Sequence, residues 1–205
     1  RSALIFGTVL SFGSVLAMGA FINLLSASLL ALTIAFYVFI YTMWLKRRTP
    51  QNIVIGGAAG AFPPMIGWAS VSGEVSLEAI ALFAIIFFWT PPHFWALALY
   101  RADDYRNVGV PMLPVVAGKA VTRLQILIYT LILIPVTLSP VALGTCGIAY
   151  GIGAGAFGLI FFGFALQVWR VGDVNDRPAR RLFGYSIFYL FALFALMLGE
   201  RLIGS

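Results

Sequence analysis

Seven long apolar runs constrain the fold of this chain more than any other feature. In the 205-residue sequence they lie at about residues 3–22, 24–45, 52–72, 76–99, 124–145, 147–169 and 183–203. Each approaches the roughly 20 residues that an α-helix needs to cross the hydrocarbon core of a bilayer. Only 10% of the residues are charged, against about 25% in soluble domains. The sequence therefore predicts an all-α protein, a polytopic transmembrane helix bundle with about seven spans.

Two of these runs contain adjacent prolines, which remove helical hydrogen bonds. Pro63 and Pro64 follow a string of small residues in the run at 52–72, which could therefore be a broken or re-entrant segment. Pro91 and Pro92 directly precede His93 and are expected to open the helix around it.

The basic residues test the number of spans independently, because they collect in cytoplasmic loops. Threading the chain through seven spans places 12 of its 13 Lys and Arg residues on one side and leaves Arg201 at the far end of the last span. This basic side is predicted to face the cytoplasm or its organellar equivalent. The net charge of +6 then follows from topology, and no nucleic-acid partner is needed to explain it.

The loop after the fourth run contains the adjacent carboxylates Asp103 and Asp104. If the helix continues into this loop, Asp104 lies one turn from Tyr100 and Arg101, and Asp103 lies one turn from Arg106. One hypothesis is therefore a solvated helix end held by weak salt bridges.

The other hypothesis gives the same residues a chemical role. Carboxylates can hold Mg²⁺ while the neighbouring Arg106, Lys119 and Arg123 bind a phosphate or diphosphate. Two carboxylates rarely suffice for a metal, and a second acidic cluster should face them. Asp173 and Asp176 do not fill that role well, because their loop is rich in arginine and favours salt bridges.

His93 is the only histidine and lies inside the fourth apolar run. An ionisable side chain within a membrane helix is a candidate functional residue. Its imidazole could bind a metal, position a substrate or bond to a carbonyl freed by the prolines. Trp89, Phe94 and Trp95 could line a site for a flat aromatic ligand, or they could serve packing alone.

Two long strings, LKRRTPQNIVIGG and WTPPHFWALA, resemble the protohaem IX farnesyltransferases, or haem O synthases. These are a branch of the UbiA-type intramembrane prenyltransferases, and the resemblance covers essentially the whole chain. It implies a nine-helix bundle with two aspartate-rich motifs that bind Mg²⁺ and the diphosphate of farnesyl diphosphate. It also implies transfer of the farnesyl group to a vinyl group of haem B, the second substrate, to make haem O.

Carried over position by position, the resemblance places Asp103 and Asp104 on the second aspartate-rich motif, as metal ligands and catalytic residues. Asp104 is the stronger candidate, and His93 is the third candidate catalytic residue. Tyr100 stands where relatives outside this branch carry a further aspartate. The candidate substrate-binding residues are Lys46, Arg47, Arg48, Gln51, Asn52, Tyr100, Arg101, Arg106 and Lys119.

The family's first aspartate-rich motif, NxxxDxxxD, would precede the helix that begins near Ala3, as would two further helices. Residues 1–205 are therefore expected to be a single prenyltransferase domain without its first two helices and first motif. Little or no activity is expected of this piece by itself.

Other functions remain open from the sequence. A UbiA-type enzyme could use another aromatic acceptor, and a transporter could share the basic rim, although transporters usually carry several ionisable residues at mid-membrane. The bacterial inner membrane is favoured over the mitochondrial one. The expected partners are the lipid bilayer, farnesyl diphosphate, haem B and a haem A synthase or terminal oxidase assembly.

Overall fold

The computed structural model describes residues 2–204, which fold into helices joined by short connections. The elements are α1 (Ser2–Phe21), α2 (Leu24–Ala35), the π-helix η1 (Phe36–Leu45), α3 (Asn52–Ser72), α4 (Leu77–Tyr100), α5 (Ala102–Asn107), α6 (Leu113–Val116), α7 (Lys119–Ala142), α8 (Ile148–Val171) and α9 (Arg177–Gly204). Within the described residues, seven helical segments are long and apolar enough to cross a membrane, with α2 and η1 forming one of them. The predicted all-α bundle is confirmed, and the chain is an integral multi-pass membrane protein.

The helix boundaries differ from the hydropathy boundaries where basic residues begin a helix. α7 starts at Lys119 rather than at residue 124, and α9 starts at Arg177 rather than at residue 183. Long basic side chains can place their charge in the polar interface while their backbone stays helical. Hydropathy therefore marks the part of a helix that lies in hydrocarbon, and it misses the first turns.

Both proline pairs lie inside continuous helices, Pro63 and Pro64 in α3 and Pro91 and Pro92 in α4. Of the two options for the third run, the unbroken helix is therefore the one observed, and the predicted opening of the helix around His93 is wrong. A proline removes one N–H donor, but the remaining helical bonds and the neighbouring helices can hold the backbone in place.

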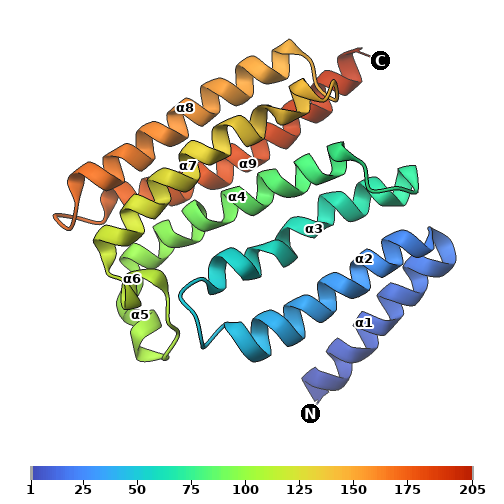
Figure 1. Ribbon diagram of the computed structural model, residues 1–205, viewed down its shortest axis with the longest axis horizontal. Helices are drawn as coiled ribbons and strands as arrows, with labels where there is room; N and C mark the ends of the chain where they lie inside the picture. Colours follow the sequence, from blue (N-terminus) through green and yellow to red (C-terminus); the bar gives the residue numbers. More distant parts are fainter. Residues whose placement is uncertain (1, 205) are drawn as a thin grey trace.

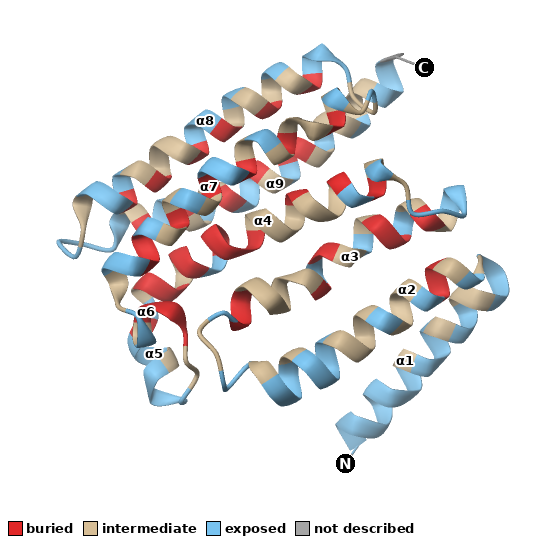
Figure 2. Cartoon of the chain, in the orientation of Figure 1, coloured by how far each residue is buried: buried red, intermediate tan, exposed pale blue. Residues whose placement is uncertain are grey.

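The core lies where α4 packs against α7 and α9, with α8 on the side of α7 and α9 that faces away from α4 (Figure 1). The largest buried side chains there are Trp95, Ile126, Tyr150, Phe161 and Tyr189. Among the described elements, α1 contacts only α2; it contains no buried residue and is almost entirely exposed (Figure 2). Its apolar surface suits an environment of hydrocarbon rather than water.

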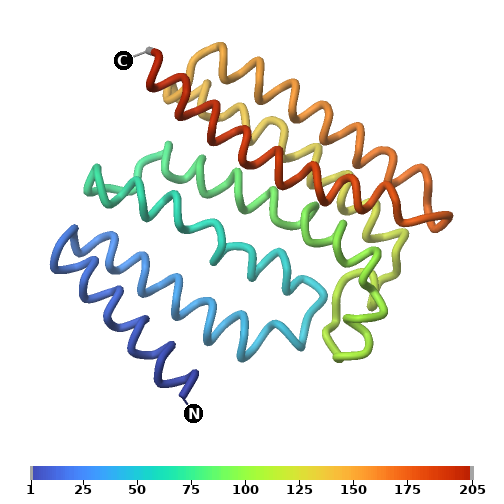
Figure 3. The backbone as a smooth tube through the Cα atoms, turned by 180° about the vertical axis from the view of Figure 1, so that it is seen from behind, coloured from blue at the N-terminus to red at the C-terminus, as the bar shows by residue number. Residues whose placement is uncertain are grey.

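The connections from η1 to α3, from α4 to α7 and from α8 to α9 lie at one end of the bundle (Figures 1 and 3). We call this the basic end; it contains the segments 46–48, 101–119 and 170–181. The turns between α1 and α2, α3 and α4, and α7 and α8 lie at the other end. The three basic loops are therefore together, as the threading predicts, and their orientation toward the cytoplasm stays a prediction.

Candidate active site

Asp103 and Asp104 lie at the basic end in α5, which is separate from α4. Helix α4 stops at Tyr100, where Arg101 leaves helical geometry with φ −117° and ψ 20°, so the condition that the helix continues into the loop is not met. Asp104 Oδ2 nevertheless lies 3.0 Å from Arg101 Nη1, and Asp103 Oδ1 lies 2.5 Å from Arg106 Nη1. All four side chains are exposed, so each pair contributes only about 0–1 kcal/mol.

A small apolar cluster holds this acidic loop against the start of α3. Tyr105 packs with Ile53 and Met112. Burial raises the pKa of Tyr105, with smaller contributions from Tyr100 and Asp104. The phenol therefore remains protonated and anchors α5, while the neighbouring aspartates stay in solvent.

Asn52 connects the acidic loop to the basic loop that follows η1. Its side chain is buried, and its amide N–H groups donate to the carbonyls of Thr49 at 2.8 Å, Lys46 at 3.4 Å and Pro111 at 3.4 Å. A buried amide with several partners rigidifies the loops that it joins. Asn52 therefore positions the loops, whereas Gln51 is exposed beside it.

The side chains of Lys46, Arg47 and Arg48 are exposed, and none of them forms a salt bridge within the described residues. Their charges are thus available to an anion. Together with the loosely paired Arg101 and Arg106, they make the basic end suited to a phosphate-bearing group.

An ion pair with two hydrogen bonds joins α7 to the loop before α9. Arg123 is buried and donates to both carboxylate oxygens of Asp173, at 2.8 and 3.2 Å. These hydrogen bonds hold the pKa of Asp173 below its ordinary value. The predicted salt bridging of this loop is confirmed for Asp173. Lys119 lines a small hollow beside the pair.

Tyr100 contacts a cation that the sequence-based site did not include. The Arg180 guanidinium, at the start of α9, lies 4.4 Å from the centre of the Tyr100 ring. Tyr100 also meets Phe183 edge to face, with ring centres 6.3 Å apart. Tyr100 therefore belongs to the seam between α4 and α9.

His93 lies deeper in that same seam. Its imidazole is stacked between Trp89 and Phe183, with ring centres 4.3 and 4.6 Å away. Its Nδ1 lies 2.7 Å from the Ser186 hydroxyl. The freed carbonyls of the proline pair are therefore not its partner. Since α4 rises about 1.5 Å per residue, His93 lies about 10 Å along the helix from Tyr100.

An apolar cavity of about 670 Å³, wide open at the surface of the bundle, continues from this seam between α3, α4 and α9. Trp89 lines it together with Pro64, Ile86, Ile187 and Leu190. Such a volume lies within the range of small-molecule sites. One helix interface thus contains the Arg180–Tyr100 contact at the basic end, His93 deeper in the bundle, and the cavity, which extends from there toward the other end.

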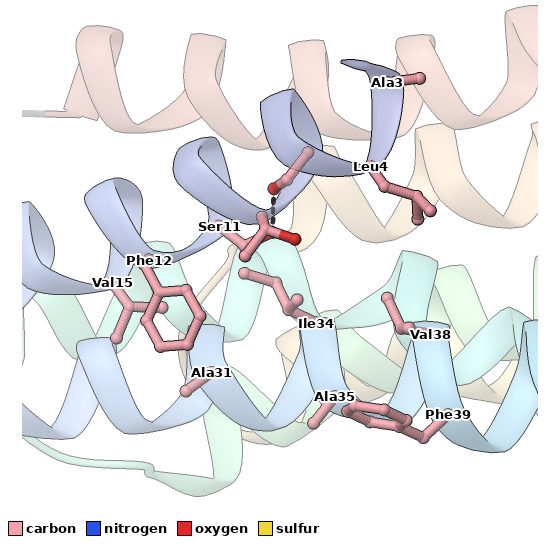
Figure 4. A pocket seen from close by; sticks show the side chains of 12 residues that line it. Ala3, Leu4, Ser11, Phe12, Val15, Ala31, Ile34, Ala35, Val38 and Phe39 are labelled. Carbon is pink, nitrogen blue, oxygen red and sulfur yellow. Dashed lines mark hydrogen bonds between the residues drawn. The ribbon is translucent and has the colours of Figure 1, made fainter. Parts of the chain in front are cut away.

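A second apolar hollow, of about 500 Å³, lies between α1 and α2 (Figure 4). Two hydroxyl residues, Thr8 and Ser11, line it, and the Ser11 hydroxyl already donates to the Gly7 carbonyl at 2.8 Å, the dashed line in the figure. Ligand sites normally combine an apolar wall with a few free polar groups. This hollow suits a lipid chain better than a reacting substrate.

The aspartates do not by themselves form a metal site. Among residues 2–204, no group of three or more His, Cys, Asp or Glu side chains is arranged to hold a metal ion. Asp103 and Asp104 each bond to a different arginine. The predicted Mg²⁺ role of Asp103 and Asp104 therefore stays a prediction, and it requires further oxygen ligands from outside this pair.

The model of the UbiA prenyltransferase family matches residues 1–196 of the chain. The chain belongs to this family. Among its UbiA relatives, proteins named protoheme IX farnesyltransferase are similar over almost its whole length. The chain is 59% identical over 206 residues to the protein from Parvibaculum lavamentivorans and 59% over 205 residues to that from Azorhizobium caulinodans. The one from Rhizobium johnstonii is 56% identical over 202 residues.

These alignments cover 98–100% of this UbiA chain but only 64–67% of each relative. The chain thus spans about two thirds of the length of the curated relatives that it matches. No solved structure matches it. It stays a prediction that the chain lacks the first two helices and the first aspartate-rich motif of its family.

The structure separates the predicted site residues of this UbiA protein into two groups. One group surrounds the loops of the basic end: Lys46, Arg47, Arg48, Gln51, Asn52, Arg101, Asp103, Asp104, Arg106 and Lys119. The other group, His93 and Tyr100, lies along the seam between α4 and α9. Sequence reasoning missed Arg180, Phe183 and Ser186, because they lie far away in the chain and carry no local motif.

Proposed function

We propose that this protein transfers a farnesyl group from farnesyl diphosphate to a vinyl group of haem B, making haem O. The observation that carries the proposal is its 59% identity to relatives named protoheme IX farnesyltransferase. The cationic loops at the basic end and the histidine in the nearby aromatic seam support it, because the reaction needs a diphosphate site and a flat acceptor site.

The proposed reaction begins at the allylic diphosphate. The bond between C1 of the farnesyl group and the diphosphate oxygen breaks, and both electrons leave with the diphosphate. The vinyl group of haem B attacks the allylic cation and forms a carbon–carbon bond. Water then adds to the resulting cation and loses a proton, which gives a hydroxyethylfarnesyl substituent.

The basic end is the proposed diphosphate site. Lys46, Arg47 and Arg48 would bind the leaving group directly, because their charges are exposed and lack salt-bridge partners among the described residues. Asn52 would keep this loop next to the acidic loop. Mg²⁺, when bound, would help to neutralise the diphosphate, and this role remains a prediction for Asp103 and Asp104.

The seam between α4 and α9 is the proposed acceptor site. The cavity beside Trp89 is apolar, which suits both the prenyl chain and a tetrapyrrole, and it limits early quenching of the cation by water. His93 is an ionisable side chain in the middle of this seam and is the proposed contact for haem B. Arg180, at the basic end of the seam, could pair with a propionate of the acceptor.

The test uses membranes that contain the complete gene product, supplied with haem B, farnesyl diphosphate and Mg²⁺. Mass spectrometry would look for the hydroxyethylfarnesyl adduct in the wild type, in Asp104→Ala and in Asp176→Ala as a matched control from another loop of the basic end. We expect product in the wild type and control, and a loss of at least tenfold in Asp104→Ala.

If the Asp104→Ala variant still forms product, Asp103 and Asp104 serve only as salt-bridge partners. If the well-folded wild type forms no product from haem B but does form product from another aromatic acceptor, the protein catalyses a different UbiA-type reaction. Absence of product from every acceptor would refute the prenyltransferase proposal.

The proposed location is the bacterial inner membrane, with the basic end in the cytoplasm. The clustering of basic segments at one end of the bundle supports this orientation. Haem B and farnesyl diphosphate are the proposed substrates, and a haem A synthase or terminal oxidase assembly is the proposed destination of haem O.

A further inference from the structure

Ser186 of α9 binds two ring side chains of α4 at once. Its backbone carbonyl accepts the indole N–H of Trp89 at 2.8 Å. Its hydroxyl lies 2.7 Å from His93 Nδ1 and 2.6 Å from the carbonyl oxygen of Phe183. Ser186 is completely buried, so water does not compete for these bonds.

The two hydroxyl contacts determine where the protons lie. A carbonyl oxygen can only accept, so the single hydroxyl proton of Ser186 must point at Phe183. The hydroxyl oxygen then offers a lone pair toward His93, and Nδ1 must donate its N–H to it. If the hydroxyl donated to Nδ1 instead, two oxygens with lone pairs would face each other at 2.6 Å without a proton between them.

In the neutral imidazole only one nitrogen carries hydrogen. A proton on Nδ1 therefore leaves Nε2 with a free lone pair. Within the described residues, Nδ1 is the only ring nitrogen of His93 that has a hydrogen-bond partner. Stacking between Trp89 and Phe183 prevents the ring from turning over, so Nε2 keeps its place in the seam.

We propose that Ser186 is a positioning residue that holds His93 in the Nδ1–H tautomer, so that the lone pair of Nε2 is presented to the iron of the tetrapyrrole acceptor. This inference rests on the proposed function for its ligand. The tautomer itself depends only on the hydrogen bonds between α4 and α9. Partners of this kind fix the tautomer of metal-binding histidines and typically change affinity or activity about 10–100-fold.

The tautomer can be measured directly by ¹⁵N NMR of the complete gene product, labelled in its histidines and held in lipid nanodiscs. His93 is the only histidine of these 205 residues, and loss of its signal in His93→Gln identifies it. Two-bond proton–nitrogen correlations distinguish Nδ1–H, Nε2–H and the doubly protonated ring. We expect Nδ1–H in the wild type.

Ser186→Ala should lose this preference and show the Nε2–H form or a mixture. Ser186→Thr, which keeps a hydroxyl, should restore Nδ1–H and shows that a changed signal is not caused by misfolding. Ser139→Ala is the matched control, because the Ser139 hydroxyl donates at 2.7 Å to the carbonyl of Val136 in the same local geometry. Nε2–H or a doubly protonated ring in the wild type would overturn the proposal, as would an unchanged tautomer in Ser186→Ala.

A second measurement tests the use of the lone pair. Zinc protoporphyrin IX, a diamagnetic substitute for haem, should shift the Nε2 resonance strongly and the Nδ1 resonance weakly. In the membrane assay, Ser186→Ala should reduce product about 10–100-fold, with activity kept in Ser186→Thr and Ser139→Ala. An Nε2 resonance that does not respond to the porphyrin overturns the iron contact. Lack of product in every variant, wild type included, would refute the proposed function and leave the measured tautomer standing.

Discussion

Gly56 of α3 lies directly against the ring of Tyr41 in the π-helix η1. A Cβ atom built at Gly56 would fall well inside van der Waals distance of two ring carbons and 3.0 Å from Tyr41 Cγ. Carbon atoms prefer a separation of about 3.5–4.0 Å. Gly56→Ala should therefore push the ring or the helix away by about 1 Å.

Gly60, one turn further along α3, is a matched control because a Cβ atom there meets nothing within 4 Å. Both substitutions gain the same helix propensity, up to about 1 kcal/mol. The difference between the two variants therefore isolates the clash. Overpacking of this kind costs about 1–3 kcal/mol.

Unfolding in mixed detergent micelles would measure this difference as a free energy. Each kcal/mol corresponds to about 2–4 °C in the midpoint of thermal unfolding for a chain of this size. We expect Gly60→Ala to equal or exceed the wild type and Gly56→Ala to lie below both. Equal stabilities of the two variants would show that Tyr41 does not pack on α3 as described.

Three other measurements test separate contacts. Asp173→Asn should lower the unfolding temperature at neutral pH. The hydrogen bond from Arg123 lowers the carboxyl pKa of Asp173 from its ordinary value of 3.8. The pair therefore stabilises the folded state when the pH is above 3.8. The deficit should close as the pH falls below 3.8, and a deficit independent of pH would contradict the ion pair. Glu200→Ala should lower the free energy of unfolding by about 1–2 kcal/mol in a denaturant titration, because the Glu200 carboxylate accepts the N–H groups at the start of α8, including that of Gly147 at 2.6 Å. Glu200→Gln should recover part of this stability. An unchanged stability in Glu200→Ala would refute the role of Glu200 as a helix cap. Arg47→Cys in a Cys146→Ser background should react with an impermeant maleimide only from the cytoplasmic side, and labelling from outside would reverse the topology.

The amino-acid sequence alone was sufficient to predict the membrane spans and one set of ion pairs. An apolar segment of about 20 residues must satisfy its backbone hydrogen bonds internally, so it forms a helix whatever its neighbours are. The pairs of Asp103 with Arg106 and of Arg101 with Asp104 depend only on spacing within one turn. They formed even though the helix broke at Arg101.

The prolines show that the sequence of one helix does not by itself predict whether the helix is continuous. Because a proline lacks the N–H donor of a helical hydrogen bond, Pro63 and Pro91 suggest a break when each helix is considered by itself. Both helices are nevertheless continuous. The surrounding helices and the unaltered hydrogen bonds on either side outweigh the lost donors. This balance depends on packing partners that hydropathy does not identify.

Only the tertiary structure decided which faces of the helices meet. Ser186 contacts His93 across 93 positions of the sequence, and Arg123 contacts Asp173 across 50. A membrane helix is apolar on the side that faces lipid and on the side that faces protein, so hydropathy does not distinguish them. The sequence therefore determined that His93 lies within the membrane, and the packing of α4 on α9 decided which hydroxyl and which rings it contacts.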